Sequence, residues 1–390
     1  MIKAAIVGCG KMADQHVAQL RRIPDAAIVG VCDVEPIMAK QLHERGAAGA
    51  WFTAVGDMIR ATRPDVVHVT TPPQSHFELG TLVLNSGCHA YIEKPFTLTA
   101  AEAEELVALA TRVGRHVTPG HNALFTHAMV EMRRLVATGF LGGPPTHVES
   151  MYCYELGADP YASAVLGDGA HWVRRLPGSL LQNIISHGVS RIAEYLADDR
   201  PIVKAHGFTS PALRASGERG LIDEARVIIA DRAGTTTAYF TFSTSMKPVP
   251  HQVRLYGPKR SLLVDDDHQI VIRLENHEYK SYYRYFIPPL GFAGQHLKNL
   301  ARNVARFARN DFHMPFDAGL KRLIEAFYRT ISTGAPPPIP YRDVLLTARI
   351  MDDIFAQIAE TPQDAASAPA LPSCTEMRAV SRMPARCLRT

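Results

Sequence analysis

The first part of the chain alternates short apolar runs with amphipathic segments of helix length. The runs are continuous and rich in β-branched residues, which is typical of parallel strands covered on both faces. These runs lie at Ala4–Val7, Ala27–Cys32, Asp65–Thr70, Ala90–Glu93 and His116–Thr118. Helices are expected between them at Met12–Arg22, Pro36–Gly46, Gln74–Ser86 and Ala100–Val113. Thr99 and Glu102 form a capping-box pattern at the start of the last helix. The alternation predicts an α/β doubly wound sheet.

After about residue 122 the pattern changes to runs in which apolar and polar residues alternate, joined by short turns. This pattern favours an antiparallel sheet. Strands are expected at Thr146–Tyr154, Ile202–Phe208, Ala225–Ile229, Thr235–Phe242, Gln252–Tyr256, Ser261–Val264 and Gln269–Leu274. Helices are expected at Met129–Thr138, Leu180–Leu196, Gln295–Arg309, Asp317–Thr330 and Tyr341–Ala359. We therefore expect one domain over residues 1–122 and an α+β domain with an open, largely antiparallel sheet over residues 123–360. Residues 361–390 lack periodicity and are predicted to be a mobile tail.

Composition excludes several classes of protein. A chain of 390 residues with 46% hydrophobic and 21% charged residues is an ordinary globular protein of about two domains. The net charge of +4 is too small to indicate binding to nucleic acid. No apolar stretch approaches the roughly 20 residues of a membrane span. The 6 cysteines lack paired spacing, and the 17 histidines form no metal-binding motif. We expect a cytoplasmic protein without a metal site.

A glycine loop follows the first apolar run. Gly8, Gly10 and Ala13 form the dinucleotide-binding fingerprint with alanine at its third position. The first glycine permits a tight turn, and the second lets the backbone approach a pyrophosphate. Amide donors at Lys11 and Met12 open the helix that follows. The loop predicts a Rossmann domain.

Asp33 ends the second apolar run, 23 residues after Gly10. A carboxylate at this place accepts hydrogen bonds from the adenosine ribose hydroxyls. No arginine follows closely to neutralise a 2′-phosphate, so NAD rather than NADP is predicted. The alternative for Asp33 is a solvated acid in a loop.

Further motifs occur in a fixed order along the chain. They are His16, Thr70–His76, Glu93-Lys94-Pro95 and Gly120-His121-Asn122. With the glycine loop, they make the chain resemble the glucose–fructose oxidoreductase / inositol dehydrogenase / MocA (Gfo/Idh/MocA) family, strongly over residues 1–150 and loosely over 180–360.

The resemblance implies a Rossmann domain followed by an open-faced mixed sheet that often makes dimer or tetramer contacts. It implies NAD or NADP as cofactor and substrates that are sugars, cyclitols or their derivatives. Besides the glycine loop and Asp33, the cofactor contacts that it implies are Thr70, Thr71, Pro72, His76, Glu93, Lys94 and Asn122.

Two positions depart from the family pattern. The family commonly has an aspartate four residues before a catalytic histidine, and here Asn183 precedes His187. An arginine usual two residues after the Asn122 position is Leu124 here. The first change puts a proton relay through residue 183 in question, and the second alters the substrate pocket.

Oxidation of a secondary alcohol needs a group that takes the hydroxyl proton while hydride leaves the carbon. Lys94 follows the end of a parallel strand, where ligands bind in such sheets, and burial or a nearby cationic nicotinamide lowers the pKa of a lysine. His187 is the rival base. Asn183, one helical turn earlier, would orient the imidazole without the stabilisation that a carboxylate gives to its cation.

A glycine-bounded segment offers residues for substrate recognition. Trp172 would stack on a sugar face, and Arg174 or Arg175 would meet an anionic group. A solvated loop with extended arginines explains the same residues. His121 and Asn122 are candidates for contact with substrate or nicotinamide.

The sequence thus predicts reversible hydride transfer between NAD and a hydroxyl or keto carbon of a sugar-like metabolite, in a homodimer or homotetramer. Two alternatives remain open. Some relatives of the family are glycosidases or lyases that oxidise their substrate transiently and recycle NAD. The third possibility is an NAD-binding regulator without turnover.

Overall fold

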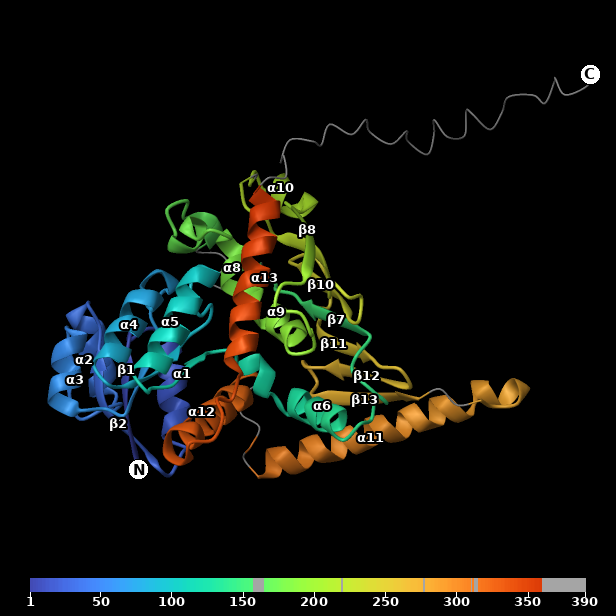
Figure 1. Cartoon of the computed structure of the whole chain (residues 1–390), viewed down its shortest axis with the longest axis horizontal. Coiled ribbons are helices and arrows are strands. Elements are labelled where there is room, and N and C mark those ends of the chain that lie inside the picture. Colours follow the sequence, from blue (N-terminus) through green and yellow to red (C-terminus); the bar gives the residue numbers. More distant parts are fainter. Residues whose placement is uncertain (157–164, 219, 276–277, 310, 312–314, 360–390) are drawn as a thin grey trace, which may run out of the picture.

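The computed structural model describes residues 1–156, 165–218, 220–275, 278–309, 311 and 315–359 (Figure 1). The predicted tail at 361–390 lies outside the described residues. The described chain forms two units, each built on one sheet, and helix α13 runs along both (Figure 1). In this part of the chain no helix is long and apolar enough to cross a membrane.

The first unit is a six-stranded parallel sheet in the order β3-β2-β1-β4-β5-β6. Its strands are β1 (Ile2–Val7), β2 (Ala26–Cys32), β3 (Trp51–Phe52), β4 (Val66–Val69), β5 (His89–Ile92) and β6 (Val117–Pro119). Its helices are α1 (Lys11–Leu20), α2 (Pro36–Glu44), α3 (Val55–Thr62), α4 (His76–Asn85) and α5 (Ala100–Arg112). The central strands are buried along their length because helices cover both faces. This strand order confirms the predicted Rossmann sheet.

Local signals predicted the helix starts well. Thr99 Oγ1 accepts a hydrogen bond from the Glu102 backbone N–H at 3.2 Å, so the predicted cap of α5 is present. Helix α3 and the two-residue strand β3 were missed, because both are too short to show a clear period.

The second unit is a seven-stranded sheet in the order β13-β12-β11-β7-β10-β9-β8. Its strands are β7 (His147–Tyr152), β8 (Ile202–Phe208), β9 (Glu224–Ala230), β10 (Thr237–Ser243), β11 (His251–Tyr256), β12 (Arg260–Asp265) and β13 (Ile270–Glu275). Only the β7–β10 pair is parallel, which confirms the largely antiparallel sheet. Helices α6 (His127–Ala137), α9 (Ser186–Ala193) and α13 (Tyr341–Ala359) pack on it.

The segment predicted as one helix over Leu180–Leu196 is two. Helix α8 (Ser179–Ile184) and helix α9 meet at Ile185, and Ser179 begins α8 with φ +48°. The short 3₁₀ turns η1 (Pro73–Ser75), η2 (Asn122–Phe125), η3 (Trp172–Arg175) and η4 (Ser281–Tyr285) and the helix α10 (Pro211–Ala215) complete the connections.

Two long helices of the C-terminal part lie apart from the second sheet's core. Helix α12 (Pro315–Thr333) packs against α1 and η2, so part of the chain predicted to belong to the second domain contacts the first. Helix α11 (Ile287–Ala308) projects along and beyond the edge strand β13 (Figure 1). Asn299 attaches α11 to this edge, since its amide contacts both the N–H and the carbonyl of Val271.

Candidate active site

The glycine loop has the geometry that its sequence predicts. Gly8 has φ +90°, and a Cβ placed on it would lie 2.7 Å from the Thr71 side chain and 2.8 Å from the Thr71 nitrogen. The loops after β1 and β4 therefore approach too closely for any side chain at position 8. Nothing lies within 4 Å of a Cβ placed on Gly10. Open space thus faces the N-terminus of α1, where no side chain caps the first amides.

Asp33 lies at the end of β2, beside this loop. Its carboxylate accepts hydrogen bonds from the backbone N–H groups of Cys9 at 2.7 Å and Glu35 at 2.9 Å. A carboxylate has about four acceptor sites, so it can still accept from ribose hydroxyls. Asp33 thus fixes the shape of the glycine loop in addition to the ribose role predicted for it.

The loop after β4 is anchored by its own side chains. Thr70 Oγ1 donates to the carbonyl oxygens of Gly8 at 2.6 Å and Val7 at 3.0 Å. His76 is fully buried, and its two ring nitrogens lie 2.9 Å from Thr71 O and 2.8 Å from Pro95 O. The imidazole therefore joins the loops that follow β4 and β5, and the cofactor contact predicted for it remains a prediction. Pro72 is exposed at the turn.

Lys94 lies just after β5 and points across to the second unit. Its Nζ donates a hydrogen bond to the backbone carbonyl oxygen of Asn183 at 2.9 Å. Burial lowers the pKa of Lys94, and the neighbouring Glu93 opposes that change. For Glu93, burial acts to raise the pKa, but the hydrogen bond with His16, the charge that His16 carries when it is protonated and the nearby ammonium of Lys94 outweigh it, and the pKa is lowered. The pair thus combines a buried carboxylate whose pKa is lowered with a lysine whose pKa is also lowered.

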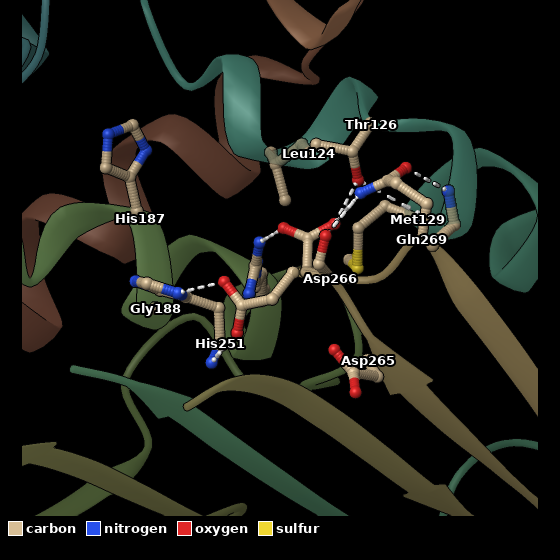
Figure 2. Close-up of polar contacts among 12 residues, drawn as sticks. Leu124, Thr126, Met129, His187, Gly188, His251, Asp265, Asp266 and Gln269 are labelled. Carbon is tan, nitrogen blue, oxygen red and sulfur yellow. Dashed lines mark hydrogen bonds and ion pairs between the residues drawn. The ribbon is translucent and has the colours of Figure 1, made fainter. Parts of the chain in front are cut away.

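His187 lies at the start of α9 and is 7% exposed. Its Nδ1 is buried without a hydrogen-bond partner among the described residues. Burial, and then the charge of Lys94, hold the pKa of His187 well below its usual value, so the ring is neutral near pH 7. Figure 2 shows His187 apart from the hydrogen bonds that gather on Asp266.

His121 joins Lys94 and His187 to form a basic cluster. The rings of His121 and His187 have centroids 6.4 Å apart. Burial is the main cause that lowers the pKa of His121, to about 4, and the Lys94 charge contributes. Neither ring nitrogen of His121 has a described partner. A cavity of about 20 Å³ beside it, lined also by Gln182 and Ser186, has room for one water but not for a sugar ring.

Asn122 begins η2 directly after His121 and is partly buried. Helix α12 approaches it closely, since a Cβ placed on Gly319 would lie 2.3 Å from Asn122 O. Leu124, where the family has an arginine, is buried and cannot meet solvent. These positions agree with a structural role for η2 and leave substrate contact by Asn122 a prediction.

The predicted substrate loop lies at the boundary of the two units. Gln74 Nε2 donates to Trp172 O at 3.3 Å, so this loop contacts the nucleotide-side loop after β4. Arg174 is held by Glu218 at 2.6 Å and by Val165 O at 2.8 Å, which gives it a structural partner. Arg175 is exposed. Of the two arginines, Arg175 is the one whose charge faces water.

Beneath α9 lies a polar network that sequence reasoning missed. Asp266 pairs with the fully buried Arg191 and accepts hydrogen bonds from Thr126 at 2.6 Å and Gln269 at 2.9 Å (Figure 2). Arg191 follows His187 by one helical turn and lies over the Tyr152 ring, 5.2 Å from its centroid. The network therefore fixes the helix that carries His187. An arginine on the apolar face of a predicted helix was its signal in the sequence.

Two further buried polar residues were also missed. His68 lies inside β4, and Tyr328 lies in α12. Their side chains meet at 2.8 Å, and His68 continues to His16 at 2.9 Å. A histidine within a continuous apolar strand was the available signal for His68, because a buried polar group needs a partner.

Comparison with known proteins relates this geometry to a family. Residues 2–121 match the family model described as "Oxidoreductase family, NAD-binding Rossmann fold", whose name is GFO_IDH_MocA. Over these residues the chain is similar to the Gfo/Idh/MocA oxidoreductase family. The match, together with the strand order of the first sheet, supports the predicted resemblance and confirms the fold class and the nicotinamide cofactor.

Curated Gfo/Idh/MocA-like relatives match mainly this domain. D-glucoside 3-dehydrogenase of Escherichia coli (strain K12) is 32% identical over 143 residues, covering 36% of this chain and 40% of the relative. Glycosyl hydrolase family 109 protein 2 of Akkermansia muciniphila is 25% identical over 229 residues, covering 54% and 47%. The chain thus spans less than half the length of these two relatives.

Solved structures of other dehydrogenases share the fold of both described units. The WlbA dehydrogenase from Bordetella pertussis, in complex with NADH and UDP-GlcNAcA, has a TM-score of 0.71 and 14% identity, with 92% of this chain and 95% of that chain covered. A myo-inositol dehydrogenase structure from Sinorhizobium meliloti has a TM-score of 0.69, 18% identity and coverage of 92% and 98%. At such identities the likeness establishes the fold.

Proposed function

We propose that this protein is an NAD-dependent oxidoreductase that transfers hydride between the nicotinamide and a hydroxyl or keto carbon of a sugar, cyclitol or sugar-derived metabolite. The observation that carries the proposal is the position of Lys94. Its amine follows a strand of the NAD-binding domain, hydrogen-bonds to Asn183 O at 2.9 Å and has a lowered pKa. A lysine with these properties at the boundary of two domains is suited to handle a proton.

The residues present fit the dinucleotide. The open space above Gly10, the uncapped amides that begin α1 and the carboxylate of Asp33 match a pyrophosphate and an adenosine ribose. Thr71 lies directly against Gly8 in the same loop region. When bound, NAD supplies the hydride acceptor for oxidation or, once reduced, the donor.

Lys94 acts as the acid–base group in this proposal. As a neutral amine it keeps an N–H for the carbonyl oxygen of Asn183 and offers its lone pair to the substrate hydroxyl. The O–H proton would pass to Nζ as the carbon–oxygen double bond forms, and bound NAD would supply the acceptor for the hydride that leaves the C–H bond. Reduction reverses each transfer. Because its contact with residue 183 is made by the backbone, the change from aspartate to Asn183 leaves this step intact.

His187 and His121 serve the substrate as neutral groups. Both rings are held neutral near pH 7 by burial, so each can offer one N–H and one lone pair. We assign them hydrogen bonds to substrate oxygens next to the reacting carbon. Trp172 and Arg175 are proposed to contact the rest of the substrate from η3.

The substrate class follows from the relatives, which are named as dehydrogenases of glucosides, apiose and inositol. The test is a panel of sugars, polyols and nucleotide-sugars with NAD, followed by absorbance at 340 nm. Net NADH formation with at least one member supports the dehydrogenase. No absorbance change, together with no product by mass spectrometry, contradicts it and favours the regulator.

One observation supports a second candidate function, that of a glycosidase that recycles NAD. Two relatives named as family 109 glycosyl hydrolases match 54% of this chain, beyond the Rossmann domain. A glycosidase that oxidises and then reduces its substrate leaves NAD unchanged overall. Hydrolysis of a p-nitrophenyl glycoside without net absorbance at 340 nm identifies that reaction.

We also propose that the protein is a homo-oligomer in which α11 contacts a second copy. Along this helix, large apolar side chains are more than half exposed at Leu290, Leu297, Leu300, Val304 and Phe307. They recur every three, four or seven residues and therefore share one face. An exposed apolar face of this extent marks an interaction site. The helix is attached to an edge strand of the open sheet, the element that the family resemblance associates with oligomer contacts.

A further inference from the structure

A line of hydrogen bonds connects the residue beside Lys94 to the far side of the first unit. Glu93 Oε1 lies 3.0 Å from His16 Nε2, His16 Nδ1 lies 2.9 Å from His68 Nδ1, and His68 Nε2 lies 2.8 Å from the Tyr328 hydroxyl. We call these four side chains the Glu93–Tyr328 chain. None of the four is more than 5% exposed. Glu93 directly follows β5, and the other three come from α1, β4 and α12; neighbours along the chain are 52 to 260 residues apart in sequence.

Donor and acceptor rules give the chain a direction. A carboxylate only accepts, so His16 donates to Glu93 through Nε2–H. A neutral His16 then accepts at Nδ1, and the donor has to be Nδ1–H of His68. His68, held neutral by burial because its pKa is far below the usual value, accepts in turn at Nε2 from the Tyr328 hydroxyl. Every donor along the chain therefore points toward Glu93.

The opposite direction leaves a hydroxyl without a partner. If His16 carried a second proton, it would donate to His68, which would then donate to Tyr328 through Nε2–H. The Tyr328 hydroxyl hydrogen would need another acceptor, and the described residues show no hydrogen bond from this hydroxyl other than that to His68. A buried donor without a partner is unfavourable, because it has lost its hydrogen bond to water without a replacement. The geometry therefore favours an ionised Glu93 with neutral histidines behind it.

Glu93 and Lys94 have few other charged neighbours. Among the described residues, the remaining titratable groups that act on them are His76 from α4, His121 just before η2, His187 from α9 and Tyr91 within β5. Burial lowers the pKa of each of these three histidines. The carboxylate also lies against Gly120, where a Cβ would come within 2.8 Å of it. Among the described groups, Glu93 is thus the anion whose charge acts on Lys94, and its carboxylate also accepts a hydrogen bond from the Lys94 backbone N–H.

We propose that the Glu93–Tyr328 chain keeps Glu93 ionised and thereby sets the pH at which Lys94 accepts the substrate proton. His16, His68 and Tyr328 are positioning residues, since they act only through Glu93. The assignment rests on the proposed role of Lys94 for its catalytic meaning, but the charge coupling itself can be measured without any substrate.

Loss of the donor to Glu93 should change the proton affinity of Lys94. His16→Leu leaves a buried carboxylate without its hydrogen bond, which favours its protonated form. Lys94 then loses an opposing charge, and its pKa falls by about one unit or more. His16→Gln keeps an N–H toward Glu93 and an oxygen toward His68, so it should restore the wild-type value. Glu93→Gln should behave as His16→Leu does.

The first measurement is competitive labelling of Lys94 with acetic anhydride across a pH series, read by mass spectrometry. Because only the neutral amine reacts, the midpoint reports the pKa of Lys94. The midpoint should move to lower pH by about one unit in His16→Leu and Glu93→Gln, and return in His16→Gln. Coincident curves for wild type and both variants would overturn the proposal.

The second measurement uses the wild-type protein and so does not depend on whether a variant folds. Nitrogen-15 NMR of labelled histidines distinguishes the two neutral tautomers. His68 should carry its proton on Nδ1 and His16 on Nε2, with Tyr328→Phe shifting the His68 Nε2 signal and so assigning it. An Nε2–H tautomer at His68 contradicts the chain. If labelling and tautomers agree but no sugar is ever oxidised, the proposed function fails while the coupling stands.

Discussion

The ammonium of Lys94 and the backbone carbonyl oxygen of Asn183 lie 2.9 Å apart and join the NAD-binding unit to helix α8. Lys94 is thus held by a backbone carbonyl, which any residue at position 183 would provide. The contact of Lys94 therefore does not depend on the side chain at position 183, whose predicted role is to orient His187.

Lys94→Ala should lower turnover by roughly 10²–10⁴-fold, the usual span for a positioned acid–base group. NAD affinity should change little, because the groove at Gly8, Gly10 and Asp33 is untouched. Asn183→Ala is the matched control and should cost far less, since it preserves the carbonyl. Steady-state kinetics and NAD titration of both variants measure this. Equal losses in the two variants would contradict the assignment of Lys94.

Cofactor choice should depend on Asp33. We expect tighter binding of NAD than of NADP, because the carboxylate repels a 2′-phosphate. Asp33→Ser should reduce the preference by about tenfold, which is about 1.4 kcal/mol. The exposed Asp25, at the opposite end of β2, supplies the control Asp25→Asn, which should leave the ratio unchanged. Fluorescence titration with both cofactors decides, and equal or tighter NADP binding by the wild type would sink the prediction.

Acid should destabilise the protein through its buried neutral histidines. The pKa of His121 is about 4 when folded, against an ordinary 6.5. The unfolded chain therefore binds a proton between these values that the folded chain does not, and stability falls as pH falls from about 6.5 toward 4. Thermal melts between pH 7 and 4.5 should show a shallower decline for His121→Gln than for wild type. Parallel curves would mean that His121 is charged in the folded protein.

The Arg191–Asp266 pair should matter more to folding than its neighbours. Asp266→Ala leaves a buried guanidinium without its anion, which costs about 3–5 kcal/mol. Asp265→Ala is the control next in sequence: Asp265 pairs with His268, whose side chain is 72% exposed, and such a pair contributes about 0–1 kcal/mol. Urea unfolding followed by circular dichroism compares the two. A similar midpoint for both variants would contradict the importance of the network (Figure 2).

The apolar face of α11 should hold the oligomer together. Leu297→Glu combined with Leu300→Glu introduces two charges that a dry interface cannot accommodate, so the mass by light scattering should fall to that of a monomer. Leu82→Glu, at an exposed apolar position on α4, should leave the mass unchanged. A monomeric wild type would contradict the proposed contact.

Residue pattern predicted most of the elements, and the exceptions have physical causes. The strand Ile202–Phe208 and the helix Tyr341–Ala359 were predicted to the residue, because each has a clean period and defined ends. Helix α11 begins at Ile287, eight residues before the predicted start at Gln295, and prolines stand within its first turn. Proline is tolerated there because those N–H groups have no partner within the helix.

The site was predictable where the chemistry is local. Gly8, Asp33 and Lys94 each lie at the end of a strand, where sequence position alone indicates the ligand edge. The partnership of His68 with Tyr328 was not predictable, because it joins residues 260 positions apart and depends on how α12 packs. The break between α8 and α9 was missed because it consists of the single residue Ile185, whose backbone keeps right-handed helical angles and leaves the apolar period almost unchanged.

The return of α12 to the N-terminal unit bears on how the protein is made. A ribosome synthesises the strands of the Rossmann sheet first. Gly319 can contact η2, and Tyr328 can contact His68 of β4, only after nearly the whole second unit has emerged. Until then His68 lacks its donor, and the buried face of α1 lacks its covering helix. The nascent NAD-binding unit is therefore incomplete during synthesis. The packing of α12 against the NAD-binding unit is therefore a late folding step between residues far apart in sequence. This step couples the folding of the two units.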